Sequence, residues 1–136
     1  MNPLKIIAFT NDSASHKWRF EGVANRINDN TEHSMFFTNR KNWNSKLVGA
    51  NLVIIEMLTG GTIVEECHKQ GSKVIYEADD AVIDSFGKER KNLQHIGQAW
   101  KDSAIKTINE CDALTVTNKH LKSNFARFTD KPIYVL

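Results

Sequence analysis

The chain has 136 residues, 40% of them hydrophobic, and its 18 Lys and Arg stand against 16 Asp and Glu for a formal net charge of +2. This profile predicts one soluble globular domain, and the even mixture of charges argues against a dedicated nucleic-acid binder. No run approaches the roughly 20 apolar residues of a membrane-spanning helix. The N-terminus also lacks a signal-peptide pattern, so we expect a cytoplasmic protein.

Short apolar runs rich in Ile, Val, Phe and Tyr recur along the chain and predict β-strands. Nearly continuous apolar runs are typical of strands that are covered on both faces in a parallel sheet. The predicted strands are residues 4–9, 34–37, 52–57, 73–76, 113–117 and 132–136.

Amphipathic segments between these runs predict helices at residues 16–28, 62–69, 92–110 and 119–128. Asp12, Ser13 or Ser15 suits the start of the first helix, and Asn118 suits the start of the last. Gly71 suits the left-handed end of the second. The alternation of strand and helix predicts an α/β fold: a doubly wound, mostly parallel, Rossmann-like sheet of about six strands with helices on both faces.

Ligands of such folds bind outside the carboxyl ends of the strands. The loop after the first predicted strand has neither G-x-G-x-x-G nor a P-loop lysine. The chain therefore lacks the usual phosphate-binding motifs for a dinucleotide or a nucleoside triphosphate. This loop instead offers Asn11, Ser13, His16 and Arg19 near a helix N-terminus, which favours anions. His16 is a candidate general base, although these side chains also fit a helix cap and a solvated first turn.

Two further strand ends carry candidate chemistry. Gly60 and Gly61 form a turn whose backbone amides suit a phosphate or carboxylate, although two glycines also suit any tight turn. Glu77, Asp79 and Asp80 place three carboxylates at the end of one strand, where like charges raise one another's pKa or require a cation. These acids are candidates for acid–base catalysis, for a metal ion, for holding Arg19, or for capping the next segment.

Cys67 and Cys111 are too few for a disulfide scaffold and lack partners at zinc-ligand spacing. We expect both to be buried or half-buried thiols.

Three segments of the chain together resemble a known family: KVIYEADD (residues 73–80), CDALTVTNKHL (residues 111–121) and KPIYVL (residues 131–136). Their order is similar to the N-terminal half of a GT-B glycosyltransferase of the group 1 bacterial and phage type. Trp18 and Arg19 are similar to an aromatic–arginine pair that follows the first strand in these enzymes.

The resemblance implies the acceptor-side domain of an enzyme that transfers a sugar from a nucleotide-sugar donor. The donor-binding half would be absent from this chain, so we expect little or no turnover by the chain alone, because positioning both substrates supplies much of the rate. By the resemblance, Asn11, Ser13, His16, Arg19, Glu77, Asp79, Asp80 and Asn118 would lie at the cleft. Together with the turn at Gly60 and Gly61, this makes His16, Asp79 and Asp80 the candidate catalytic residues. The candidate substrate-binding residues are Asn11, Ser13, Arg19, Gly60, Gly61, Glu77 and Asn118.

The family needs no nicotinamide and commonly works without an essential metal, so the resemblance implies no cofactor for this chain alone. The implied partners are a sugar acceptor or the missing C-terminal domain. A homodimer through the exposed cleft face is a further expectation, because large exposed apolar patches usually mark sites of interaction with another protein or a ligand.

Two other classes of protein fit the same pattern. A flavodoxin-like binding module or pseudo-receiver is one, since Asp12 and Lys119 loosely match the acidic pocket and lysine of a phosphoacceptor domain. Glu56 occupies the region of the phosphorylated aspartate, which argues against phosphotransfer. The other class is a small phage-type factor that binds another protein through the cleft surface.

Overall fold

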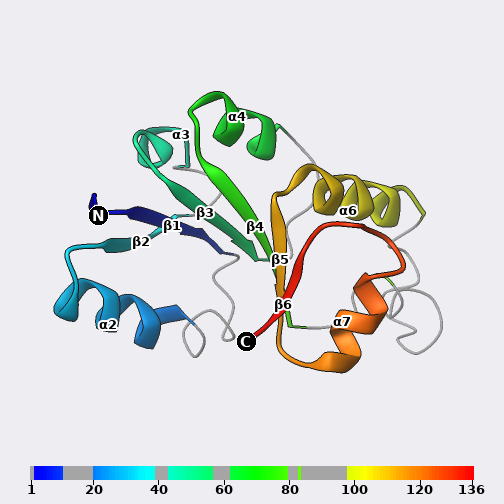
Figure 1. The fold of residues 1–136 in the computed structure, drawn as a ribbon. Coiled ribbons are helices and arrows are strands. Elements are labelled where there is room, and N and C mark those ends of the chain that lie inside the picture. Colours follow the sequence, from blue (N-terminus) through cyan, green and yellow to red (C-terminus); the bar gives the residue numbers. More distant parts are fainter. Residues whose placement is uncertain (1, 11–19, 39–42, 57–61, 80–82, 84–97) are drawn as a thin grey trace.

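Six parallel strands form one sheet in the order β2-β1-β3-β4-β5-β6 (Figure 1). The computed structural model describes residues 2–10, 20–38, 43–56, 62–79, 83 and 98–136. The chain is therefore an α/β protein with a doubly wound, Rossmann-like sheet, which confirms the predicted fold class, and the sheet is wholly parallel. The strands are β1 (Lys5–Phe9), β2 (Ser34–Thr38), β3 (Leu52–Glu56), β4 (Lys73–Ala78), β5 (Ala113–Val116) and β6 (Ile133–Val135).

Helices cover the two faces of the sheet unequally. Of the helices in the described residues, α2 alone packs on the first face, and its apolar side joins Ala8 and Met35 of β1 and β2. The other helices lie on the opposite face, as right-handed crossovers from β2 through β6 require (Figure 1). The helices are α2 (Gly22–Asn30), α3 (Trp43–Leu47), α4 (Ile63–Lys69), α6 (Gln98–Glu110) and α7 (Lys119–Phe125).

The predicted helices differ from the observed ones at their ends, and one observed helix was missed. Helix α2 lies in the second half of the predicted 16–28 segment and continues to Asn30, while residues 11–19 lie outside the described chain, together with the expected caps. Helix α7 ends at Phe125, where a turn follows. Helix α3 has only 5 residues, too few for a helical period to show in the sequence.

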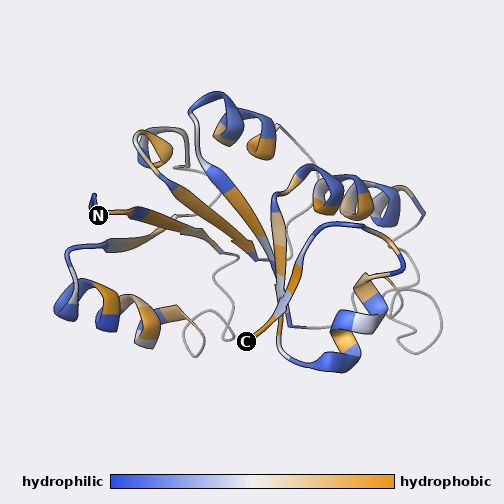
Figure 2. Cartoon of the chain, viewed as in Figure 1, coloured by the Kyte–Doolittle hydropathy of each residue, from blue (hydrophilic) through white to orange (hydrophobic). Residues whose placement is uncertain are grey.

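The larger hydrophobic core lies between the sheet and helices α4, α6 and α7. Alternate strand residues enter it, because successive side chains of a strand point to opposite faces of the sheet. Tyr76, Leu114 and Phe125 are among its largest fully buried side chains. Figure 2 shows hydrophobic residues along the strands, while the helices carry both hydrophobic and hydrophilic residues.

The expected positions of the cysteines and of Gly71 are confirmed. Cys67 and Cys111 are wholly buried free thiols, and burial raises their pKa values to about 11 and about 12. Gly71 follows α4 with a φ of 83°, the left-handed conformation that favours glycine at a helix end. None of the helices in the described part of the chain is both long enough and apolar enough to cross a membrane.

Candidate functional site

The carboxyl ends of the strands gather polar side chains at one edge of the sheet. Glu56 ends β3, and its register partner is Glu77 near the end of β4. Glu77 is in turn the register partner of Thr115 on β5. All three are buried, with Glu56 2% and Glu77 1% exposed. Because a carboxylate loses solvation when it is buried, two neighbouring buried carboxylates are a typical sign of a functional region.

Two other predicted site residues lie at the same edge. Asp79 directly follows β4 and is partly exposed, while Asn118 follows β5 and is exposed. Strands β4 and β5 are neighbours, so the structure brings Glu77, Asp79 and Asn118 to adjacent strand ends. The remaining predicted site residues lie outside the described residues: Asn11, Ser13, His16, Arg19, Gly60, Gly61 and Asp80. We call the group Glu56, Glu77, Asp79 and Asn118 the carboxyl edge.

Asn118 has a structural task at this edge. Its Oδ1 accepts a hydrogen bond of 2.9 Å from the backbone amide of Leu121, which makes it the N-cap of α7. Its Nδ2 lies 3.4 Å from Oγ1 of Thr117. The carbonyl oxygen is therefore engaged in the cap, and the amide nitrogen is the group that Asn118 can direct to a ligand.

Glu56 is the residue of the carboxyl edge that sequence reasoning did not assign to a site. The sequence feature that could have identified Glu56 is that it is the one acidic residue, at the end of the otherwise apolar strand LVIIE. Only the register of β3 and β4 shows that Glu56 lies beside Glu77 in the sheet. Across the described segments, no three His, Cys, Asp or Glu residues come together in a way that would hold a metal ion.

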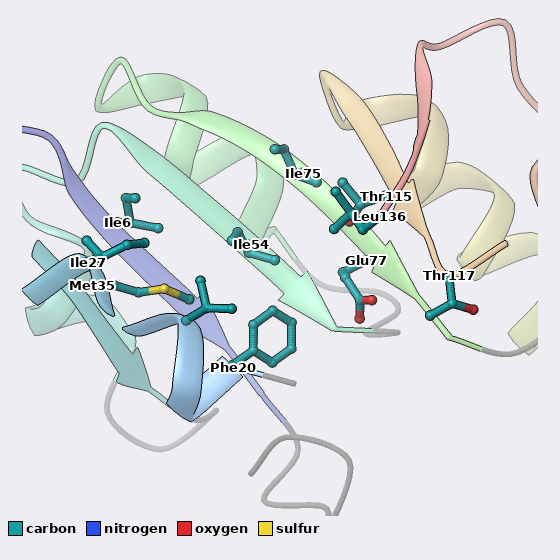
Figure 3. A pocket seen from close by; sticks show the side chains of 11 residues that line it. Ile6, Phe20, Ile27, Met35, Ile54, Ile75, Glu77, Thr115, Thr117 and Leu136 are labelled. Atoms are coloured by element: carbon teal, nitrogen blue, oxygen red, sulfur yellow. The ribbon is translucent and has the colours of Figure 1, made fainter. Parts of the chain in front are cut away.

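A groove of about 510 Å³ opens on the face of the sheet that carries α2, and it reaches the carboxyl edge at Glu77 (Figure 3). Its walls come from α2, from the five strands β1 to β5 and from residues that flank these elements. We call it the sheet-face groove. It is lined by Ile6, Phe20, Val23, Ile27, Met35, Ile54, Ile75, Glu77, Thr115, Thr117 and Leu136.

The sheet-face groove follows from the unequal distribution of helices. Helices α4, α6 and α7 all contribute to the core of the opposite face, so on this face α2 is the one described helix, and it packs beside β2. Towards β6 the face is open: Tyr134, the register partner of Thr115, is 57% exposed. Ile54 and Ile75, register partners on β3 and β4, are half-buried and form part of the groove wall.

A carboxylate with three hydrogen-bond donors lies at the opposite, amino end of the sheet. Asp112 accepts hydrogen bonds from Nζ of Lys73 (2.8 Å), from the backbone amide of Val74 (2.8 Å) and from Nε2 of His68 (3.0 Å). Burial by itself raises the pKa of Asp112, but these three bonds outweigh it and lower the pKa to about 2. Asp112 thereby ties α4 and β4 to the turn before β5, a structural role distant from the carboxyl edge.

Fold and site together define the class of this protein: a doubly wound α/β domain with a polar carboxyl edge and an apolar groove beside it. No family model matches the chain, and no curated protein is significantly similar to it. The functional argument therefore starts from the geometry of the carboxyl edge.

Proposed function

We propose that the chain is the acceptor-side domain of a glycosyltransferase that uses a nucleotide-sugar donor. The observation that carries the proposal is the placement of Glu77, Asp79 and Asn118 at the carboxyl ends of the neighbouring strands β4 and β5. In doubly wound sheets, this edge is where ligands bind. The resemblance of residues 73–80, 111–121 and 131–136 to group 1 GT-B enzymes supports the same assignment.

The carboxyl edge suits a polyhydroxylated acceptor. Asp79 is partly exposed at the end of β4, with its Oδ1 buried. In this proposal its carboxylate accepts hydrogen bonds from sugar hydroxyls or removes a proton from the attacking hydroxyl. Asn118 offers its amide nitrogen as a donor, since its carbonyl oxygen caps α7. In this proposal His16 and Asp80 assist catalysis, and the nucleotide-sugar is held by a second domain.

A saccharide-binding measurement tests the proposal directly. The 136-residue chain is applied to an array of mono- and oligosaccharides, and the ligands found are then titrated by calorimetry. We expect binding to one class of saccharide, weakened about tenfold by Asp79→Asn, because hydrogen bonds to a charged group are the stronger ones. Binding of no saccharide, or equal binding by the variant, would contradict the proposal.

The matched control for Asp79→Asn is Glu110→Gln. Glu110 is an exposed carboxylate on α6 that lies 3.5 Å from Nζ of Lys106, and its replacement changes the net charge by the same amount. We expect Glu110→Gln to leave saccharide binding unchanged. A loss of binding in both variants would indicate a general effect of charge rather than a site at Asp79.

The strand order favours one alternative, a flavodoxin-like or pseudo-receiver module. The first five strands follow the order β2-β1-β3-β4-β5, which is that of flavodoxin-like sheets. Glu56, at the end of β3, is 2% exposed and stands where a receiver carries its phosphorylated aspartate. This glutamate argues against phosphotransfer, which leaves a pseudo-receiver. Incubation with acetyl phosphate followed by intact-mass measurement tests this point: a stable phosphoryl adduct would place a receiver above the glycosyltransferase.

A further inference from the structure

The two outer strands of the sheet, β2 and β6, differ in how their outward main-chain groups are occupied. In β2, the amide of Ser34 and the carbonyl oxygen of Thr38 bond to residues that flank β1, so the alternate residues Met35 and Phe37 direct their main-chain groups away from the sheet. The side chain of Asn28 on α2 holds those of Met35: its Oδ1 accepts from the amide at 2.7 Å, and its Nδ2 donates to the carbonyl oxygen at 3.1 Å. The side-chain amide of Asn28 thus takes the place of a peptide group on a neighbouring strand.

Lys46 of α3 occupies the next outward position of β2. Its Nζ donates to the carbonyl oxygen of Phe37 at 3.2 Å. Proteins commonly protect edge strands with charged side chains, because an open edge pairs readily with other chains. The edge of β2 is therefore guarded by side chains at both Met35 and Phe37.

Strand β6, the red strand of Figure 1, is the opposite edge of the sheet. The residues that flank it, Pro132 and Leu136, bond to β5 at 2.9 Å: the carbonyl oxygen of Pro132 accepts and the amide of Leu136 donates. By the same alternation, Ile133 and Val135 direct their main-chain groups away from β5. The described part of the chain places no hydrogen-bond partner on these outward groups.

Exposed apolar side chains lie along the same edge. Tyr134 is 57% exposed, Val135 42% and Leu136 77%. An edge strand with free main-chain groups and apolar side chains is a template for pairing with another strand. The contrast with β2 therefore indicates that β6 is the edge at which the sheet is extended.

We propose that β6 pairs in antiparallel orientation with β6 of a second copy of this chain, so that the two sheets become one continuous sheet about a two-fold axis. Ile133 of one copy then opposes Val135 of the other, and each such pair exchanges two main-chain hydrogen bonds. Every outward amide and carbonyl group of β6 is satisfied in this arrangement. The interface is distinct from a dimer through the cleft face, because it uses the edge of the sheet.

The side chains of β6 favour a second copy over a foreign peptide. Self-pairing places Tyr134 of both copies at the two-fold axis, as a pair without main-chain hydrogen bonds between them, in which the two side chains are closest. Aromatic pairs at such positions stabilise a sheet. A foreign peptide would need an aromatic residue at this one register, whereas the second copy supplies it by symmetry.

A dilution series of the 136-residue chain, followed by sedimentation equilibrium, tests the proposal. We expect a weak monomer–dimer equilibrium, because two short strands bury little surface. Val135→Pro removes the outward amide but leaves the bonds to β5, since proline is tolerated on an edge where the amide would face solvent. Each dimer then lacks two hydrogen bonds, so dimerisation should weaken at least about tenfold.

Val135→Thr is the matched control for Val135→Pro. It keeps the amide and the branched shape of the side chain, and it should dimerise as the natural chain does. Urea unfolding of both variants at low concentration should match that of the natural chain. A natural chain that stays monomeric at every concentration, or a dimer that Val135→Pro leaves unchanged, would overturn the proposal.

A cysteine at the axis locates the interface without depending on Val135→Pro. The Cβ atoms of directly opposed residues in such a pair lie close to disulfide distance, so oxidised glutathione should convert Tyr134→Cys to a covalent dimer. Phe36→Cys is the control, because Phe36 is an aromatic residue of similar exposure, 50%, on the guarded strand β2. The natural cysteines, Cys67 and Cys111, are wholly buried and should not interfere. Cross-linking of Phe36→Cys as fast as that of Tyr134→Cys, or of neither variant, would contradict pairing through β6.

Discussion

Glu56 and Glu77 are register partners on the adjacent strands β3 and β4, and each is at most 2% exposed. Neighbouring parallel strands lie about 4.8 Å apart, so two carboxylates in register on one face are within range of strong mutual interaction. The pair joins the carboxyl edge to the sheet-face groove, because Glu77 belongs to both.

We predict that the contributions of these two carboxylates to stability are not additive. The free energy of unfolding in urea should be measured for Glu56→Gln, Glu77→Gln and the double variant. Because the side chains are neighbours in a buried environment, we expect a coupling free energy of about 0.5–3 kcal/mol. A double variant whose effect equals the sum of the single effects would show that the two carboxylates act independently.

Asp112 should give the chain an acid-sensitive component of stability. The pKa of Asp112 is about 2 in the folded chain, against 3.8 as the ordinary value. Its contribution is therefore complete above about pH 4 and is lost as the pH falls towards 2, because protonation removes the charge that Lys73 and His68 bind. After allowance for solvent screening, the loss is about 1–2 kcal/mol.

Urea unfolding of the natural chain and of Asp112→Asn between pH 2 and 6 measures this component. The stability of the natural chain should exceed that of the variant at pH 6, and the difference should shrink as the pH falls. Glu110→Gln serves as the control because its carboxylate is paired only at the surface of α6, with Lys106. A difference between Asp112→Asn and the natural chain that does not change with pH would contradict the prediction.

Replacement of Asn118 separates helix capping from ligand binding. Asn118→Ala removes the acceptor for the amide of Leu121 and should cost about 1 kcal/mol of stability. Asn118→Ser retains a capping oxygen and should be close to the natural chain in urea unfolding. Both variants lack the amide nitrogen, so both should weaken saccharide binding; retention of binding in the stable serine variant would remove Asn118 from the site.

The thiols of Cys67 and Cys111 should be unreactive in the folded chain. Both are wholly buried, and burial raises their pKa values to about 11 and about 12, so little thiolate exists near neutral pH. Treatment with a thiol-specific reagent at pH 8 should label neither cysteine in buffer and both in concentrated urea. Rapid labelling of the folded chain would indicate that α4 or the end of α6 opens readily.

Much of the fold was predictable because its signals are local. The apolar runs identified all the strands of the observed sheet, since a strand covered on both faces is apolar at nearly every position. Asn118 and Gly71 marked a helix start and a helix end because their side-chain and backbone chemistry act within one turn. Helix α3 was missed because its 5 residues are too short for a period.

The sequence by itself determined the order of strands and helices along the chain and the presence of acidic residues at the end of β4. Only the tertiary structure decided that Glu56 and Glu77 are neighbours, because register between strands depends on pairing across the sheet. It also decided where the sheet-face groove lies. The groove exists because the crossovers place α2 alone, among the described helices, on one face of the sheet, and no local pattern of residues encodes that placement.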